Sequence, residues 1–381
     1  MLADRIHSFI ATGGVDGDFD TLALEAFAYQ YDAHDLYGRF CESRGANPRS
    51  VAHWREIPAI PTDAFKHALT DEADRPHLFL STGTTAGERQ RSRHALRSLD
   101  TYRVSAMTHF ERMVLPDGPG PMATLLIGPS ASNEHSSLGR MFSWCLESFA
   151  SDDVAVAFDA DGNLDVAGAV TWLEEKAAGS APVLLLGVTS AFTALFDALR
   201  VADRGLRLPA DSRIVDTGGR KSGQGRTPGD DNEGDRQAVR ALSARGMLKA
   251  GWRFLHVPAY LSVNEYGMTE MLSQFYDDAW LGRCSGRLSP RSKVGPPWVR
   301  TTVVDPLSLE PAAPGQAGLL AHVDLANWET VSALQTLDLG RELGAGFELL
   351  GRASGAEARG CSQLLATVAA HDEPRERGNT A

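Results

Sequence analysis

The stretch that decides the fold is Val183-Leu-Leu-Leu-Gly-Val-Thr-Ser-Ala-Phe-Thr-Ala-Leu-Phe-Asp-Ala-Leu-Arg-Val201. Its first six residues form a short apolar run typical of a buried strand, and residues 189–201 form an amphipathic segment of helical length. Similar strand and helix pairs precede it in the chain. This alternation predicts βαβ units, and therefore an α/β fold with mostly parallel sheets.

The same alternation runs from residue 98 to residue 217. The predicted strands are 122–127, 154–158, 183–188 and 214–217, and the predicted helices are 20–44, 98–113, 138–149, 166–178 and 189–201. After residue 298 the pattern changes to short β-like runs broken by Pro, Gly and Asp. We therefore predict an α/β core over 1–297, a small β-rich subdomain over 298–350, and a hinge-like segment with a disordered tail over 351–381.

Composition limits the classes of partner. The chain has 381 residues and a formal net charge of −12, which argues against nucleic acid because phosphate-backbone binding needs a basic face. No apolar run approaches the length of a membrane span, and the first residues lack a signal-peptide core. Cys41, Cys145, Cys284 and Cys361 are far apart and in no metal spacing. We expect a cytoplasmic protein with free thiols and no membrane partner.

Two short motifs carry the chemistry. The loop Ser81-Thr-Gly-Thr-Thr-Ala-Gly87 has no bulky side chain, so its backbone N–H groups can approach phosphate oxygens. It is not a Walker loop, since it lacks Gly-Lys-Ser/Thr. In Tyr266-Gly-Met-Thr-Glu270, an aromatic face, a hydroxyl and a carboxylate suit a base, a phosphate and a hard cation. Alone, the loop also fits a flexible polar loop, and the pentapeptide also fits a strand-end turn with a buried Tyr; together the two motifs favour a nucleotide site.

In this order the two motifs resemble those of the adenylate-forming enzymes, which join a carboxylic acid to AMP. Ser-Gln-Phe-Tyr-Asp at 273–277, Gly351-Arg352 and Arg359-Gly-Cys-Ser362 narrow the resemblance to the acyl-protein synthetases of bacterial luciferase operons. The resemblance covers most of the chain and implies ATP and Mg²⁺ as cofactors. Complete adenylate-forming enzymes carry an essential lysine in a large C-terminal lobe. No lysine follows Lys293, so we expect that lobe to be lacking.

The resemblance gives roles to the residues of both motifs. Tyr266, beside Gly267, would stack on adenine, Thr269 would contact the α-phosphate, and Glu270 would help to hold Mg²⁺. The residues that would contact the other phosphates are Ser81, Thr82, Gly83, Thr84 and Thr85. The lysine that usually follows this loop would be replaced by Arg89, Arg91 or Arg93, and the sequence leaves the choice open.

Further residues match the family at single positions. Gly218, Gly219 and Arg220 follow an apolar strand where the family contacts adenine, although a strand-ending turn is the alternative. Asp338 and Arg352 match the ribose-binding Asp and the hinge Arg, and an exposed Asp in a β-turn is the alternative for the first. His135, in Ser132-Asn-Glu-His-Ser-Ser137, would face the carboxylate being activated or belong to a helix cap.

Cys361 lies where the luciferase-operon family carries its acyl group. Its thiolate would attack the mixed anhydride to give a thioester, with Arg359 favouring the thiolate and Gly360 letting the segment swing. A small buried apolar role is the alternative, and that is the role predicted for the other three cysteines.

The sequence therefore predicts a ligase that activates a carboxylic acid, by resemblance a fatty acid, as acyl-AMP. Cys361 would then carry the acyl group to a partner acyl reductase. One alternative transfers the acyl group to CoA, an amine or a carrier protein and leaves Cys361 structural. Another is a nucleotide-binding regulatory protein with a decayed site, which Ala86, Ala353 and the missing lysine would allow.

Overall fold

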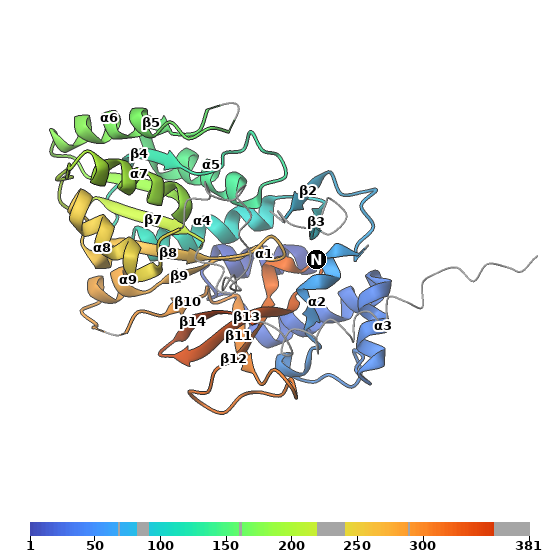
Figure 1. Cartoon of the computed structure of the whole chain (residues 1–381). Coiled ribbons are helices and arrows are strands. Elements are labelled where there is room, and N and C mark those ends of the chain that lie inside the picture. Colours follow the sequence, from blue (N-terminus) through green and yellow to red (C-terminus); the bar gives the residue numbers. More distant parts are fainter. Residues whose placement is uncertain (68, 82–90, 160–161, 219–240, 289, 354–381) are drawn as a thin grey trace, which may run out of the picture.

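A computed structural model describes residues 1–67, 69–81, 91–159, 162–218, 241–288 and 290–353 (Figure 1). Its helices are α1 (Leu2–Ala11), α2 (Phe19–Ala33), α3 (Asp35–Ser43), α4 (Asp100–Val114), α5 (Ser137–Phe149), α6 (Val166–Ala177), α7 (Thr189–Val201), α8 (Ala244–Leu255) and α9 (Ala279–Cys284). Its strands are β1 (Ile60–Pro61), β2 (His77–Leu80), β3 (Arg93–Leu96), β4 (Met122–Ile127), β5 (Ala150–Val156), β6 (Val183–Val188), β7 (Arg213–Thr217), β8 (Ser262–Tyr266), β9 (Phe275–Asp277), β10 (Lys293–Val294), β11 (Val299–Val304), β12 (Gly318–Asp324), β13 (Ala333–Leu343) and β14 (Gly346–Arg352).

Within the described residues, one 12-stranded sheet organises the molecule. Its order is β11-β12-β13-β14-β10-β9-β8-β7-β6-β4-β5, with β1 paired to β13. Neighbouring strands from β5 to β8 are parallel, whereas those from β8 to β11 are antiparallel. In Figure 1, β5 and β4 lie at the top, β7, β8, β9 and β10 lie below them, and β11 to β14 lie at the bottom. The predicted α/β fold is confirmed, and its parallel strands form one half of a larger mixed sheet.

Helices cover both faces of the parallel half. β6 and β7 are almost completely buried, which explains their continuous apolar sequences. The chain passes from β4 to β5 through α5, then returns past β4 through α6, α7 and α8 to β6, β7 and β8. Because crossovers are right-handed, this reversal places α5 with α4 on one face and α6 to α8 on the other. The reversal creates a switch point, where ligands of such sheets bind outside the carboxyl ends of the strands.

The predicted helix over 20–44 is wrong in one respect, because the structure has two helices there. His34 separates α2 from α3 with an extended backbone (φ −123°, ψ 98°). Its buried Nε2–H donates to the carbonyl oxygen of Glu329 at 3.1 Å. The partner lies far along the chain, so the local spacing of apolar residues does not reveal the break.

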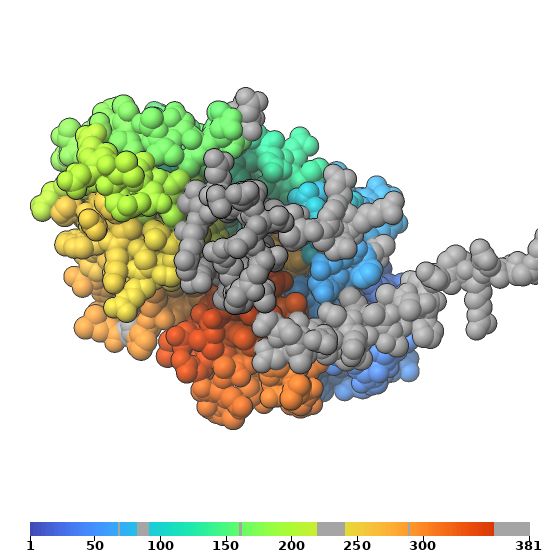
Figure 2. Space-filling model, viewed as in Figure 1, coloured from blue at the N-terminus to red at the C-terminus, as the bar shows by residue number. Residues whose placement is uncertain are grey.

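The β-rich stretch after residue 298 continues the main sheet. β11 to β14 form an antiparallel ribbon, and β10 joins β14 to β9. Gln30 of α2 ties the N-terminal helices to this part, since its amide nitrogen donates to Ser332 Oγ at 2.7 Å. In Figure 2 the orange to red residues lie at the bottom, below the green and yellow residues, and the blue N-terminal residues lie on the right. The predicted boundary at 297 thus falls between neighbouring segments of one sheet.

The described cysteines differ in their surroundings. Cys41 and Cys145 are buried, as predicted for structural residues, and burial raises the pKa of the Cys41 thiol to about 12. Cys284 is exposed, so its predicted core role is wrong. It ends α9, a short helix that turns Trp280 and Gly282 to the interior instead. In the described ranges, no helix has both the length and the apolar character needed to cross a membrane.

Candidate functional site

The described candidate residues gather at the carboxyl edge of the parallel strands. His135 lies in the loop after β4, Gly218 follows β7, and Gly267 to Glu270 follow β8. The β2–β3 hairpin joins the same edge, because the Leu80 N–H donates to the carbonyl oxygen of His135 at 3.0 Å. The predicted sites Thr82, Gly83, Thr84, Thr85, Gly219, Arg220 and Cys361 lie outside the described residues.

Ser81 begins the predicted phosphate loop of residues 81–87, and Ser92 lies five residues after its last residue. The Ser81 N–H donates to the Ser92 carbonyl at 3.0 Å, and the Ser92 N–H donates to Ser81 Oγ at 2.9 Å. Arg91 Nε also donates to the Ser81 carbonyl at 2.6 Å. These bonds tie together the described residues on either side of the predicted loop.

Tyr266 ends β8 with a largely buried ring. The rings of Phe275, His322 and Phe347 lie around it, with centroids 5.8, 6.2 and 5.7 Å away. Its hydroxyl donates to Asp338 Oδ2 at 2.9 Å, and Asp338 lies opposite Arg352 in the β13–β14 register. The structure therefore brings together Tyr266, Asp338 and Arg352, although residues 266 and 352 are 86 positions apart in the sequence. Burial raises the pKa of Asp338, whereas the Tyr266 hydrogen bond and the Arg352 charge oppose that rise.

The turn after β8 presents Thr269 and Glu270. The Thr269 carbonyl accepts a hydrogen bond from His94 Nδ1 at 2.8 Å, and the Glu270 carbonyl accepts one from Asn327 Nδ2 at 2.7 Å. Glu270 is 9% exposed, and burial raises the pKa of its carboxyl against the opposing effects of the Ser92 hydroxyl and the Arg352 and Lys66 charges. A Cβ on Gly267 would overlap Oε1 of Glu265, so a larger residue here would have to displace the Glu265 carboxylate.

The structure assigns the cap near His135 to its neighbour Ser136, and the role of His135 toward a carboxylate stays a prediction. Ser136 caps α5, because its hydroxyl accepts from the Gly139 N–H at 3.0 Å. His135 itself is exposed, and its Nδ1–H donates to the Leu78 carbonyl at 2.9 Å. The neutral ring then carries its acceptor on Nε2. The cap is thus supplied by Ser136, and His135 lies beside the strand that leads to Ser81.

The described carboxylates fit a metal ion that arrives with a nucleotide. Among the described residues, no three His, Cys, Asp or Glu side chains lie close enough to hold a metal. Glu270 brings a single carboxylate to the carboxyl edge. Mg²⁺ commonly takes one or two carboxylates together with substrate phosphates and water, so one carboxylate suits a nucleotide-borne Mg²⁺.

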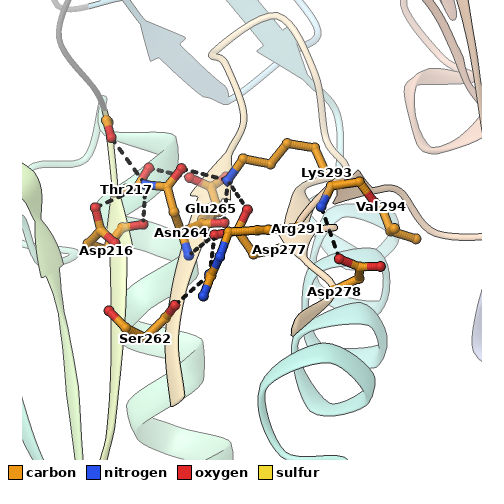
Figure 3. A network of polar contacts seen from close by, with 12 residues as sticks. Asp216, Thr217, Ser262, Asn264, Glu265, Asp277, Asp278, Arg291, Lys293 and Val294 are labelled. Atoms are coloured by element: carbon orange, nitrogen blue, oxygen red, sulfur yellow. Dashed lines mark hydrogen bonds and ion pairs between the residues drawn. The ribbon is translucent and has the colours of Figure 1, made fainter. Parts of the chain in front are cut away.

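A buried polar network lies directly below this edge (Figure 3). Asp216 and Thr217 of β7 pair with Asn264 and Glu265 of β8. Asn264 Nδ2 donates to Asp216 Oδ2 at 2.9 Å and to the Gly218 carbonyl at 3.2 Å. Gly218 has φ +90°, a conformation that favours glycine. The network thus holds the backbone where β7 ends.

Lys293 supplies the buried positive charge of this network. Its ammonium donates to the Asn264 carbonyl at 2.6 Å and forms an ion pair with Asp277 at 3.1 Å. Burial raises the pKa of Asp216 to about 6 and that of Glu265 to about 7, although Lys293 opposes both shifts. The Thr217 hydroxyl donates to the Glu265 carboxylate. Sequence reasoning missed this network; its one signal was the polar residues interrupting apolar strands.

Glu265→Gln should change how stability depends on pH. The folded-state pKa of Glu265 is raised to about 7 from its ordinary 4.5. The protonated group therefore stabilises the fold below pH 4.5, and this contribution is lost as pH rises toward 7. Glutamine cannot ionise, so the variant does not lose this contribution. Its free energy of unfolding should therefore rise relative to that of wild type between pH 4.5 and 7. Urea denaturation at several pH values measures it, with exposed Glu111→Gln as the control. A pH-independent difference would contradict the assignment.

Known proteins resemble this chain in sequence and in fold. No protein-family model matches the chain. The long-chain-fatty-acid–luciferin-component ligase of Aliivibrio fischeri is 22% identical over 363 residues, covering 92% of this chain and 88% of that protein. An open conformation of 2-hydroxyisobutyryl-CoA ligase in complex with 2-HIB-AMP and CoA gives a TM-score of 0.56 at 14% identity, covering 87% of this chain and 74% of that one.

The same CoA ligase in its postadenylation state with 2-HIB-AMP gives a TM-score of 0.58 at 13% identity, over 87% of this chain and 67% of that chain. These structural likenesses show the fold, and the sequence likeness to the Aliivibrio protein spans nearly the whole chain. The resemblance seen in the motifs is confirmed. The chain is a distant homologue of the Aliivibrio long-chain-fatty-acid ligase, and it shares the fold of the 2-hydroxyisobutyryl-CoA ligase structures.

Proposed function

We propose that this chain uses ATP to activate a fatty acid as acyl-AMP and then carries the acyl group on Cys361 for a partner acyl reductase. One observation carries the first half. The base of the phosphate loop, the Thr269–Glu270 turn and the Tyr266–Asp338 pair meet at one edge of the sheet. An aromatic ring, hydroxyls and a carboxylate in this order suit adenosine, phosphate and a hard cation.

In the first step, a carboxylate oxygen of the acid attacks the α-phosphorus of ATP. An O–P bond forms, the bond between the α-phosphorus and the bridging oxygen breaks, and pyrophosphate leaves. Tyr266 and Asp338 would hold the adenosine, and the loop from Ser81 with Thr269 would donate to the phosphates. Glu270 would hold Mg²⁺, which offsets the charge on the phosphates. His135 would face the acid.

In the second step, the Cys361 thiolate attacks the acyl carbonyl carbon. A C–S bond forms, the C–O bond to AMP breaks, and AMP leaves; the thiol proton passes to solvent. The resulting thioester keeps the acyl group activated for a reductase. The likeness to the Aliivibrio ligase over most of both chains supports a fatty acid as the substrate. Regions 1–297, 298–350 and 351–381 would act as core, sheet extension and acyl-carrying segment.

The substrate prediction is tested by acid-dependent exchange of labelled pyrophosphate into ATP. With Mg²⁺ and a panel of acids, medium- and long-chain fatty acids should support exchange, and polar amino acids and aryl acids should not. Intact-mass measurement should then show one acyl group on the protein. If only aryl or amino acids support exchange, the prediction of a fatty-acid substrate is wrong, whereas the prediction of adenylation holds. If the protein binds ATP but supports exchange with no acid, it is a nucleotide-binding protein and not a ligase.

A further inference from the structure

The return strand of the phosphate-loop hairpin faces the turn after β8. Side chains alternate along a strand, so Ser92 and His94 share one face and Arg93 lies on the other. Ser92 and His94 are both buried. Arg93 instead pairs at the surface with Glu72, at 2.6 Å. Ser92, just before β3, and His94, within β3, therefore turn two polar side chains inward a few residues after the predicted loop.

Both inward side chains contact the Thr269–Glu270 turn. His94 Nδ1 lies 2.8 Å from the Thr269 carbonyl, and the Ser92 hydroxyl bonds to the Glu270 carboxylate. A carbonyl oxygen accepts only, so Nδ1 must carry the hydrogen. Ser92 also closes the base of the loop with Ser81. Ser92 and the adjoining strand β3 thus link the loop base to both residues of the turn.

The second nitrogen of His94 is held as well. Nε2 lies 3.0 Å from Thr330 Oγ1, and the ring packs against Phe65 with centroids 5.3 Å apart. Burial lowers the pKa of His94 to about 4, so the ring is neutral near pH 7 and Nε2 accepts from the Thr330 hydroxyl. With both nitrogens bonded and one tautomer fixed, the ring is a rigid bridge.

We propose that His94 is a positioning residue for adenylation, which sets the phosphate-loop hairpin against the Thr269–Glu270 turn through its bond to the Thr269 carbonyl. The proposal rests on the proposed function, because it assumes that loop and turn share one nucleotide. Small misplacements of groups around a reacting phosphate lower the rate of the chemical step more than they weaken binding. The expected signature is a loss of kcat with little change in the KM for ATP.

Two amide substitutions separate this role from a structural one. His94→Asn places an N–H near the position of Nδ1 and keeps the bond to Thr269. His94→Gln reaches toward Thr330 and loses the bond to Thr269. We expect the kcat of pyrophosphate exchange to stay within about threefold of wild type for His94→Asn, and to fall at least about tenfold for His94→Gln. Thr330→Val is the control: it should lower the Tm and leave kcat near wild type.

The outcomes are decisive because Tm and kinetics are measured on the same samples. Rescue by His94→Asn but not by His94→Gln, at similar Tm, supports the proposal. Equal kcat in the two amide variants, or losses that simply follow Tm across all three variants, overturn it while wild-type exchange keeps the proposed function intact. Failure of wild type to exchange with any acid removes the proposed function and this role together.

Discussion

Cys361→Ala should abolish the covalent acyl adduct and keep acid-dependent pyrophosphate exchange. Acyl-AMP formation needs only the residues at the carboxyl edge of the sheet, all upstream of Cys361. Thioester formation needs a thiol that reaches the activated carbonyl. Intact-mass measurement after incubation with ATP, Mg²⁺ and an acid that supports exchange should show the adduct in wild type alone. The Cys361 sulfur would then be needed for thioester formation but not for adenylation.

The other cysteines provide the controls for this experiment. Cys284→Ala is the matched control, because Cys284 is an exposed thiol and its removal should leave the adduct unchanged. Cys41 and Cys145 are buried with raised thiol pKa values, which makes both poor nucleophiles near neutral pH. Cys361→Ser should form at most a slow, hydroxylamine-resistant ester. If the Cys361→Ala protein still gains an acyl adduct, a residue other than Cys361 carries the acyl group.

Strands buried on both faces were the easiest elements to predict. β4 and β6 match the predicted ranges 122–127 and 183–188, because a strand covered on both faces has a continuous apolar sequence. The chain break at His34 and the joining of β11–β14 to the main sheet were not predicted. Both depend on pairing between segments distant in sequence, which local periodicity does not encode.

In the candidate site, too, some residues could be predicted from local sequence and others could not. Gly218 could be placed because it follows a buried strand, and Tyr266, Thr269 and Glu270 because they form one short motif. The ends of neighbouring parallel strands share one edge of a sheet, so these residues lie close together. His94 and Lys293 escaped notice in sequence. The partner of His94 lies 175 residues away and that of Lys293 29 residues away, and each residue alone has an ordinary sequence context.

Glu270→Gln should lower the kcat of pyrophosphate exchange at least about tenfold, which corresponds to ~1.4 kcal/mol in activation free energy. A neutral amide is a weaker ligand for Mg²⁺ than a carboxylate, so charge on the phosphates would be offset less well. The substitution keeps size and shape, and the Asn327 bond to the Glu270 backbone carbonyl is unaffected. Burial already disfavours the Glu270 charge, so the variant should be at least as stable as wild type.

This combination distinguishes lost chemistry from lost folding. Thermal unfolding should show an unchanged or higher Tm for Glu270→Gln, while exchange falls and needs more Mg²⁺ for half-maximal rate. Glu265→Gln is the informative comparison, since it neutralises another buried carboxylate on the same strand end whose partner is the Thr217 hydroxyl. If any buried negative charge near the site influenced the exchange rate, both variants would lose rate to a similar extent. If Glu270 holds Mg²⁺, only Glu270→Gln would change the Mg²⁺ concentration needed for half-maximal rate. Unchanged exchange and Mg²⁺ dependence in Glu270→Gln would place Glu270 outside the reaction.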